Sequence, residues 1–235
     1  NNLFATRLGA TDFQLSLMSL LSQMVGIAVL IPGAILTDRL SNKKSAVLFA
    51  VVLIGGAYVG AGLSPLLESL ALTGFLLFTA LSAGINALYN SSWQAFFADK
   101  VAPSRRNVVF STRTRVAFLC SMTVPLITGG VLSAAGNTAE KIRIHQIFLF
   151  AAAALAAVQV LVLSGIRGGN AAAPAGKGWR DFFQATRELA GNRAFRSFAG
   201  TALFFYVCWH MDWTMYFVGQ TQYVGLNEFW LSVSN

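Results

Sequence analysis

Six long apolar stretches dominate the sequence and limit the folds open to it. Each reaches the roughly 20 residues that an α-helix needs to cross a hydrocarbon core about 30 Å thick. They are Phe13 to Leu36, Ala46 to Pro65, Leu70 to Phe97, Val116 to Ala135, Ile144 to Ile166 and Ser197 to Tyr223. Charged residues make up only 11% of the chain, against about a quarter in soluble domains. The sequence therefore predicts an all-α, polytopic membrane protein whose spans satisfy their own backbone hydrogen bonds.

Basic residues indicate how these spans are oriented. Most of the 17 Lys and Arg residues lie in three alternate connections, at residues 39–44, 100–115 and 167–196. The other connections hold only Arg7, Lys141 and Arg143. By the positive-inside rule, the first three connections are cytoplasmic and Leu8 to Leu17 lies outside a cytoplasmic (inner) membrane. Because topology accounts for the net charge of +8, we expect no nucleic-acid partner.

Two ten-residue segments resemble each other: LGATDFQLSL at residues 8–17 and VGLNEFWLSV at residues 224–233. They share Gly, Phe, Leu and Ser at matching positions, and each leads from an outside loop into an apolar helix. An even number of spans separates them, so the two units run in the same direction through the membrane. Parallel repeats of this kind, with six helices in each half, are typical of one large transporter architecture.

The first cytoplasmic loop carries a motif, AILTDRLSNKK, at residues 34–44. It resembles the Gly-x-Leu-x-Asp-Arg-x-Gly-Arg-Lys loop between helices two and three of the major facilitator superfamily. Leu36, Asp38, Arg39 and Lys43 match the pattern, whereas Ala34 and Ser41 stand in place of its two glycines. The resemblance implies a helical bundle of that type, with this chain as a fragment covering about helices two to seven of twelve. Such a fragment alone is expected not to transport.

In that superfamily the loop is a conformational latch. The resemblance implies that Asp38 contacts the other half of the protein, while Arg39 and Lys43 contact the end of helix four. The segment ADKVAPSRR at residues 98–106 resembles the loop after helix four, and its Asp99 is the expected partner of the basic residues. Arg105 and Arg106 belong to the same loop. The alternative is that these charges only set the topology.

The third stretch contributes candidates for a substrate cavity. Asn86, Asn90, Trp93 and Gln94 fall along one helical stripe. Amides on one stripe of a membrane helix either bond adjacent helices or line a water-filled path. We favour the path, because the stripe leads toward Asp99.

The sixth stretch, FYVCWHMDWTMYFVGQTQY at residues 205–223, holds two ionisable side chains. Asp212 and His210 are candidates for coupling to a proton or Na⁺, since ionisable residues in membrane spans commonly mark functional cavities. They point about 200° apart on a straight helix, so they are not expected to act as one pair. Trp209, Trp213, Tyr216 and Gln220 are candidates for the cavity wall. The alternative is an aromatic belt at the membrane interface.

Arg113 and Arg115 precede the fourth stretch and are expected at the cytoplasmic mouth. Anchoring at the membrane surface is favoured there over attraction of an anionic substrate. Cys120 and Cys208 lie within apolar stretches and lack metal-ligand spacing, so no metal site is expected.

A connector at residues 167–196 joins the fifth and sixth stretches. It begins with the flexible composition GGNAAAPAGKG and continues with Trp179, Phe182, Phe183 and Thr186 at helical spacing, which predicts an amphipathic helix. The chain thus divides into an N-terminal bundle at residues 1–166, a cytoplasmic central loop at 167–196, and helix seven with the start of helix eight at 197–235.

These features predict a secondary active transporter that moves a small-molecule substrate across the bilayer by alternating access. We expect it to work as a monomer when full length, and to need no cofactor beyond a coupling ion. An enzyme is not expected, because no HExxH, paired acidic or Ser-His motif is recognisable. The alternative is a non-transporting receptor or scaffold of the same fold.

Overall fold

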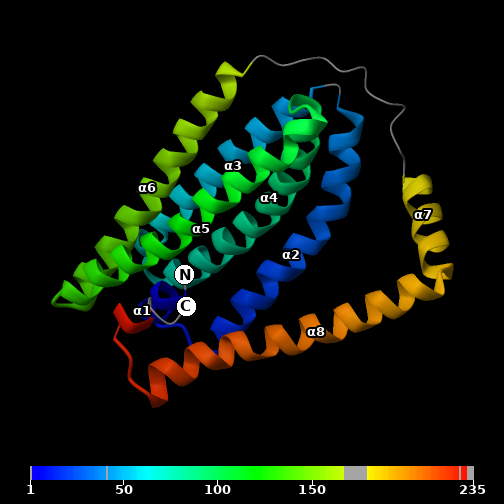
Figure 1. Ribbon diagram of the computed structural model, residues 1–235. Helices are drawn as coiled ribbons and strands as arrows, with labels where there is room; N and C mark the ends of the chain where they lie inside the picture. The colour runs from blue at the N-terminus through cyan, green and yellow to red at the C-terminus, as the bar shows by residue number, and fades with distance from the viewer. Residues whose placement is uncertain (1, 41, 167–178, 228, 232–235) are drawn as a thin grey trace.

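The computed structural model describes residues 2–40, 42–166, 179–227 and 229–231. Within these ranges, the side chains of residues 38, 39, 181, 207, 209–215, 217, 218 and 222 lie outside the described part. The described chain is helical and contains no strand (Figure 1). Its helices are α1 (Asn2–Arg7), α2 (Asp12–Arg39), α3 (Lys43–Leu63), η1 (Ser64–Leu70), α4 (Ala71–Lys100), α5 (Pro103–Ala134), α6 (Thr138–Gly165), α7 (Trp179–Gly191), α8 (Arg193–Val218) and η2 (Gly219–Tyr223).

Among the described residues, four segments are long and apolar enough to cross a membrane: Asp12–Thr37, Lys43–Lys100, Pro103–Ala134 and Thr138–Gly165. The second segment contains two helices, α3 and α4, joined by the 3₁₀ turn η1. Five of the six predicted stretches therefore fall on helices of membrane-spanning length. The sixth falls on α8 and η2, and its crossing of the membrane stays a prediction.

Two helix boundaries differ from the sequence prediction. Residues 2–7 precede the first predicted stretch, yet they form the helix α1, and its Phe4 is buried against Phe75 with ring centroids 4.8 Å apart. Helix α5 begins at Pro103 and not near Val116, because proline is well suited to a first helical turn and arginine is a good helix former. Hydropathy measures apolar content, so it places the start of this helix too late. Arg113 and Arg115 consequently lie within α5 and not in a loop.

Helices α2 and α4 pack closely along a seam of small residues. A Cβ at Gly84 of α4 would lie 2.7 Å from Val25 Cγ1, and one at Gly33 of α2 would lie 3.0 Å from Leu88 Cδ1. Nearer the end predicted to be cytoplasmic, the buried hydroxyls of Thr37 and Ser92 are 2.9 Å apart. Small residues let helix backbones approach in a membrane, where van der Waals packing and interhelical hydrogen bonds drive association.

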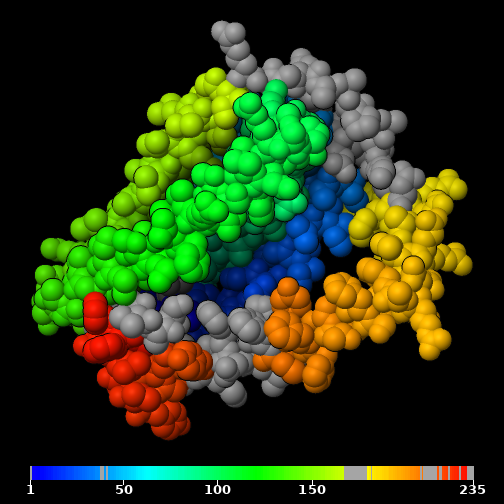
Figure 2. Space-filling model, in the orientation of Figure 1, coloured from blue at the N-terminus to red at the C-terminus, as the bar shows by residue number. Residues whose placement is uncertain are grey.

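Helix α3 packs between α4 and α6, whereas α5 is largely exposed. Val47 and Val51 of α3 join Phe96 of α4 and Leu163 of α6 in one buried cluster. In α5, all the residues from 107 to 124 are exposed. The space-filling view shows α5 crossing the front of the bundle, with α4 visible in a recess between α5 and α2 (Figure 2). One face of α4 is therefore open between two flanking helices.

The two copies of the sequence repeat adopt the same local structure. Gly9 and Gly225 occupy matching positions and both have positive φ, +86° and +67°. Two residues later, the side chains of Thr11 and Asn227 accept hydrogen bonds from the backbone N–H of Gln14 and Trp230. Leu15 and Leu231, again at matching positions, are both buried. The resemblance between the segments is thus a repeated helix entry: a left-handed glycine followed by an N-cap.

The connector contains the expected helix, α7. Its Trp179, Phe182 and Phe183 rings contact one another, with centroids 5.6 to 6.3 Å apart. Helix α8 follows after Asn192 and contacts the bundle at α2 (Figure 1). Residues 167–178, predicted to be flexible by composition, lie outside the described residues.

Candidate functional site

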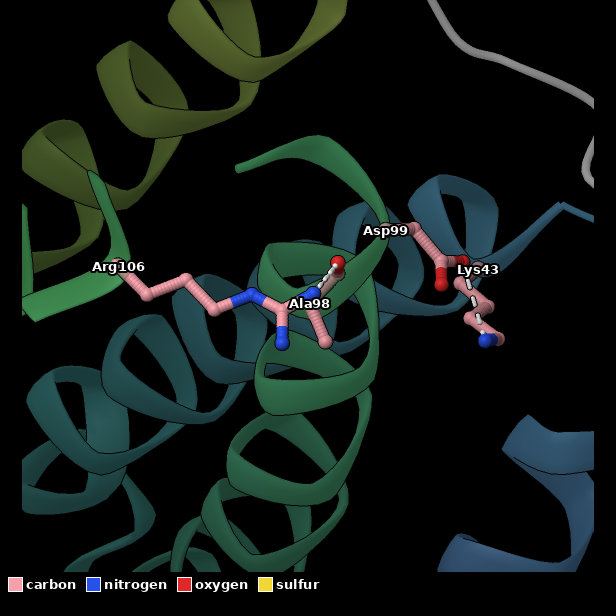
Figure 3. A network of polar contacts seen from close by, with 4 residues as sticks. All are labelled: Lys43, Ala98, Asp99 and Arg106. Atoms are coloured by element: carbon pink, nitrogen blue, oxygen red, sulfur yellow. Dashed lines mark hydrogen bonds and ion pairs between the residues drawn. The ribbon is translucent and has the colours of Figure 1, made fainter. Parts of the chain in front are cut away.

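An ion pair joins the N-terminus of α3 to the C-terminus of α4 at the end predicted to be cytoplasmic. Lys43 Nζ lies 3.0 Å from Asp99 Oδ2, and the two side chains are 18% and 33% exposed. Figure 3 shows the pair beside the last turn of α4. This is the pairing that the loop motifs imply. Its role as a latch is argued below as a proposal.

Each charge of this pair lies at the unfavourable end of its helix. A helix N-terminus carries partial positive charge and a C-terminus partial negative charge. Lys43 is the first residue of α3 and Asp99 the penultimate residue of α4, so both oppose the dipoles. Helix stability alone would therefore favour the opposite charges. The ion pair offsets this disadvantage only while the two ends stay together.

Arg106 of α5 binds backbone carbonyls at the same end of α4. Its Nη2 donates to the carbonyl of Ala98 at 2.7 Å (Figure 3). Its Nε donates to the carbonyl of Val101 at 3.1 Å. These acceptors are at the negative end of the helix dipole, so a guanidinium is favoured there. Arg105, predicted with it, is exposed and makes no side-chain hydrogen bond or ion pair with the described residues.

Lys44 ties α3 to a third helix end. Its Nζ donates to the carbonyls of Ser164 and Ile166, at the C-terminus of α6, with distances of 2.7 and 2.5 Å. The sequence placed Lys44 in the cytoplasmic loop and did not identify this partner, because backbone acceptors leave no signal in a sequence. Together, Lys43, Lys44 and Arg106 connect α3, α4, α5 and α6 at the end predicted to be cytoplasmic.

Asp38 and Arg39 belong to the last turn of α2, close in sequence to this ion pair. Their side chains lie outside the described part of the structure. The contacts that the resemblance implies for them, including contact of Asp38 with the other half, stay predictions.

The predicted stripe on α4 divides into two kinds of environment. The Asn86 amide donates to the carbonyl of Ser82 in its own helix at 2.9 Å. Asn90 and Gln94 are exposed. Trp93 is half-buried and stacks on Tyr89, with ring centroids 6.2 Å apart. Asn90 and Gln94 thus remain candidates for an open path, whereas Asn86 is bonded within α4.

The predicted set on α8 is described only in part. Tyr216 is exposed. Gln220 is buried in η2, where its backbone carbonyl accepts a hydrogen bond from the backbone N–H of Leu226 at 3.0 Å. The side chains of Trp209, His210, Asp212 and Trp213 lie outside the described residues, so their proposed parts in the cavity or in ion coupling stay predictions.

Two polar contacts among the helices were not identified from the sequence. Gln159 Nε2 of α6 donates to the Tyr89 hydroxyl of α4 at 2.9 Å. The guanidinium of Arg113 in α5 lies over the Trp93 ring, 5.4 Å from its centroid. Gln159 could have been singled out as a polar residue within the apolar run AAAALAAVQVLVL. Among the described residues, no group of three His, Cys, Asp or Glu side chains gathers to hold a metal.

The sequence of the chain matches the model of one protein family over nearly its whole length. The model of the Major Facilitator Superfamily matches residues 2–233, which is nearly the full chain. The chain belongs to the major facilitator superfamily. No curated protein and no solved structure was found to match it. Membership of this superfamily makes the chain a multi-pass membrane transporter protein.

Proposed function

We propose that this major facilitator chain works in secondary active transport, moving a small solute by alternating access across the cytoplasmic membrane. The coupling ion is a proton or Na⁺, and the full-length protein works as a monomer. The observation that supports this most is the Lys43–Asp99 ion pair, in which two charges disfavoured by their own helices meet at a helix junction. Such a contact is easily broken, as a latch requires.

The pair acts by fixing the α2–α3 loop against the end of α4. Because Lys43 is the first residue of α3, its contact with Asp99 also fixes the position of Asp38 and Arg39 at the end of α2. Asp38 then contacts the C-terminal half in one conformation, and the contact breaks when the halves rock. Exposed ion pairs contribute on the order of 1 kcal/mol or less, which suits a device that must open in every cycle.

Gradient-driven transport by the intact protein in proteoliposomes tests this function. We expect at least one labelled solute from a panel of sugars, amino acids and organic acids to accumulate when a proton or Na⁺ gradient is imposed. Accumulation should stop when an ionophore collapses the gradient. Folded protein that moves none of these solutes with either gradient would contradict the proposal and favour a receptor or scaffold.

A further inference from the structure

An apolar groove of about 390 Å³ lies between α3 and α6, within the segments of both helices that are long and apolar enough to cross a membrane. Small-molecule sites have volumes of about 300 to 1,000 Å³. The residues that line the groove are Val51, Val52, Gly55 and Val59 of α3, and Ala153, Ala156, Ala157, Val160 and Leu161 of α6. None of them has a polar side chain, so the groove suits hydrocarbon and not a polar solute.

The groove is closed at its floor and open along its rims. At the floor, a Cβ at Gly55 of α3 would lie 3.4 Å from the Cβ of Ala156 of α6, so the two helices touch there. On the rims, Val52 and Leu161 are 55% and 70% exposed. In a bilayer, the surroundings of two spanning helices are acyl chains. The open side of the groove therefore gives a hydrocarbon chain a place to lie between α3 and α6.

Lys44 lies at the end of the groove that is predicted to be cytoplasmic. Seven residues separate Lys44 from Val51, so the two share one face of α3 and lie about 10 Å apart along its axis. Its Nζ donates to the carbonyls of Ser164 and Ile166, and Ser164 is about one turn after Leu161 in α6. The ammonium is thus held between the two helices that form the groove, where the groove reaches the end of the bundle.

The charge of Lys44 is held in position without being neutralised. An ammonium has three N–H donors, and two backbone carbonyls of α6 do not cancel its charge. Among the described residues, no carboxylate forms an ion pair with Lys44, since Asp99 pairs with Lys43. The cytoplasmic leaflet carries anionic lipids whose headgroups attract basic residues at the membrane surface. A phospholipid in that leaflet has its phosphate at the level of Lys44 and its chains at the level of the groove.

We propose that the α3–α6 groove binds one acyl chain of an anionic phospholipid, whose phosphate contacts Lys44. The apolar lining accounts for the chain, and the ammonium at the end of the groove accounts for the headgroup. A single Lys near the surface favours an anionic over a zwitterionic lipid by about fivefold. The site does not depend on the proposed transport function.

Photoaffinity labelling of the purified intact protein in lipid nanodiscs tests this site. The probes are phosphatidylglycerol, which is anionic, and phosphatidylcholine, which is zwitterionic, with the same diazirine-bearing acyl chain in each. Each probe is present at the same low fraction in a phosphatidylcholine nanodisc, and mass spectrometry of peptides locates the adducts. We expect adducts on residues 51–59 and 153–161, with about a fivefold higher yield for phosphatidylglycerol.

Lys44→Gln tests the headgroup contact. We expect the variant to lose the fivefold preference, because the phosphate loses its ammonium partner, while the yield with phosphatidylcholine stays the same. Lys100→Gln is the matched control, since it removes one positive charge from the end of α4 at the same end of the bundle. It should keep the full preference for phosphatidylglycerol.

Ala157→Phe tests the groove itself. Ala157 lines the groove and is exposed, so a phenyl ring there fills the space without entering the core. We expect the groove adducts of both lipids to fall by at least about fivefold. Ala154→Phe is the matched control, because Ala154 is exposed one turn away on α6 and does not line the groove. It should leave both yields unchanged.

Three results would overturn the lipid site: equal groove yields for the two lipids, a preference that survives in Lys44→Gln, or adducts spread evenly over the membrane-facing helices. A photoactivatable label on Ala157→Cys that cross-links to protein, with no lipid adduct in the groove, would also overturn it. A helix or a second copy of the chain would then be the occupant. None of these results bears on gradient-driven transport, so the transport function stands or fails separately.

Discussion

The Gly84→Leu variant is expected to be strongly destabilised. A Cβ at Gly84 would lie 2.7 Å from Val25 Cγ1 and 3.2 Å from Val29 Cγ2, both on α2. Valine side chains in a helix have essentially one χ1 rotamer, so neither can move aside without shifting α2. Overpacking of this kind costs about 1 to 3 kcal/mol, and a leucine adds three carbons beyond the Cβ. We expect a thermal midpoint in detergent at least about 5 °C lower.

Gly26→Leu is the matched control for this change, because Gly26 is next to Val25 on α2 and a Cβ there would meet nothing within 4 Å. Fluorescence-detected size exclusion after heating measures both variants. The control should keep its monodisperse peak and midpoint. Equal midpoints for Gly84→Leu and Gly26→Leu would show that the close α2–α4 seam is not needed for the fold.

Reversing the charge of Asp99 is expected to slow transport strongly. Asp99→Lys places two ammonium groups where Lys43 Nζ and Asp99 Oδ2 are now 3.0 Å apart. Losing the attraction and adding repulsion should shift the equilibrium between conformations by about 1 to 2 kcal/mol, a factor of roughly 5 to 30. Initial rates of gradient-driven uptake into proteoliposomes measure the effect. Lys100→Gln, a charge change at the adjacent residue, should leave the rate unchanged.

The double variant Lys43→Asp with Asp99→Lys separates the pairing from the identity of each residue. It restores opposite charges. It also places the aspartate at a helix N-terminus and the lysine at a helix C-terminus, where the helix dipole favours each of them. We therefore expect it to recover most of the uptake rate lost in Asp99→Lys. If the double variant were no faster than the single one, the ion pair would not be the functional contact.

The sequence predicted the membrane-spanning helices well because the bilayer imposes a simple requirement on apolar length. It was less successful where hydropathy and helix formation differ. The basic start of α5, from Pro103 to Arg115, reads as a polar loop by composition, yet it continues the helix. Likewise, α1 is only six residues long, and no local pattern indicates the contact of its Phe4 with Phe75 on α4.

For the candidate site, sequence motifs indicated contacts between charged side chains but missed contacts with backbone or aromatic groups. The resemblance of two loops implied that Lys43 and Asp99 would meet, and they lie in contact. Lys44 bonds carbonyls of α6, and Arg113 lies over Trp93. Both depend on how separate helices pack, which no local pattern encodes.

The most direct test of the proposed latch is a distance measurement between the two halves, at the ends predicted to be cytoplasmic. Spin labels would be placed on cysteines at Ser104 of α5 and Arg193 of α8, both exposed, with Cys120 and Cys208 replaced. Double electron–electron resonance on the intact protein in nanodiscs should give two distance populations, and Asp99→Asn should increase the longer one. A single distance distribution that Asp99→Asn leaves unchanged would contradict alternating access controlled by the Lys43–Asp99 pair.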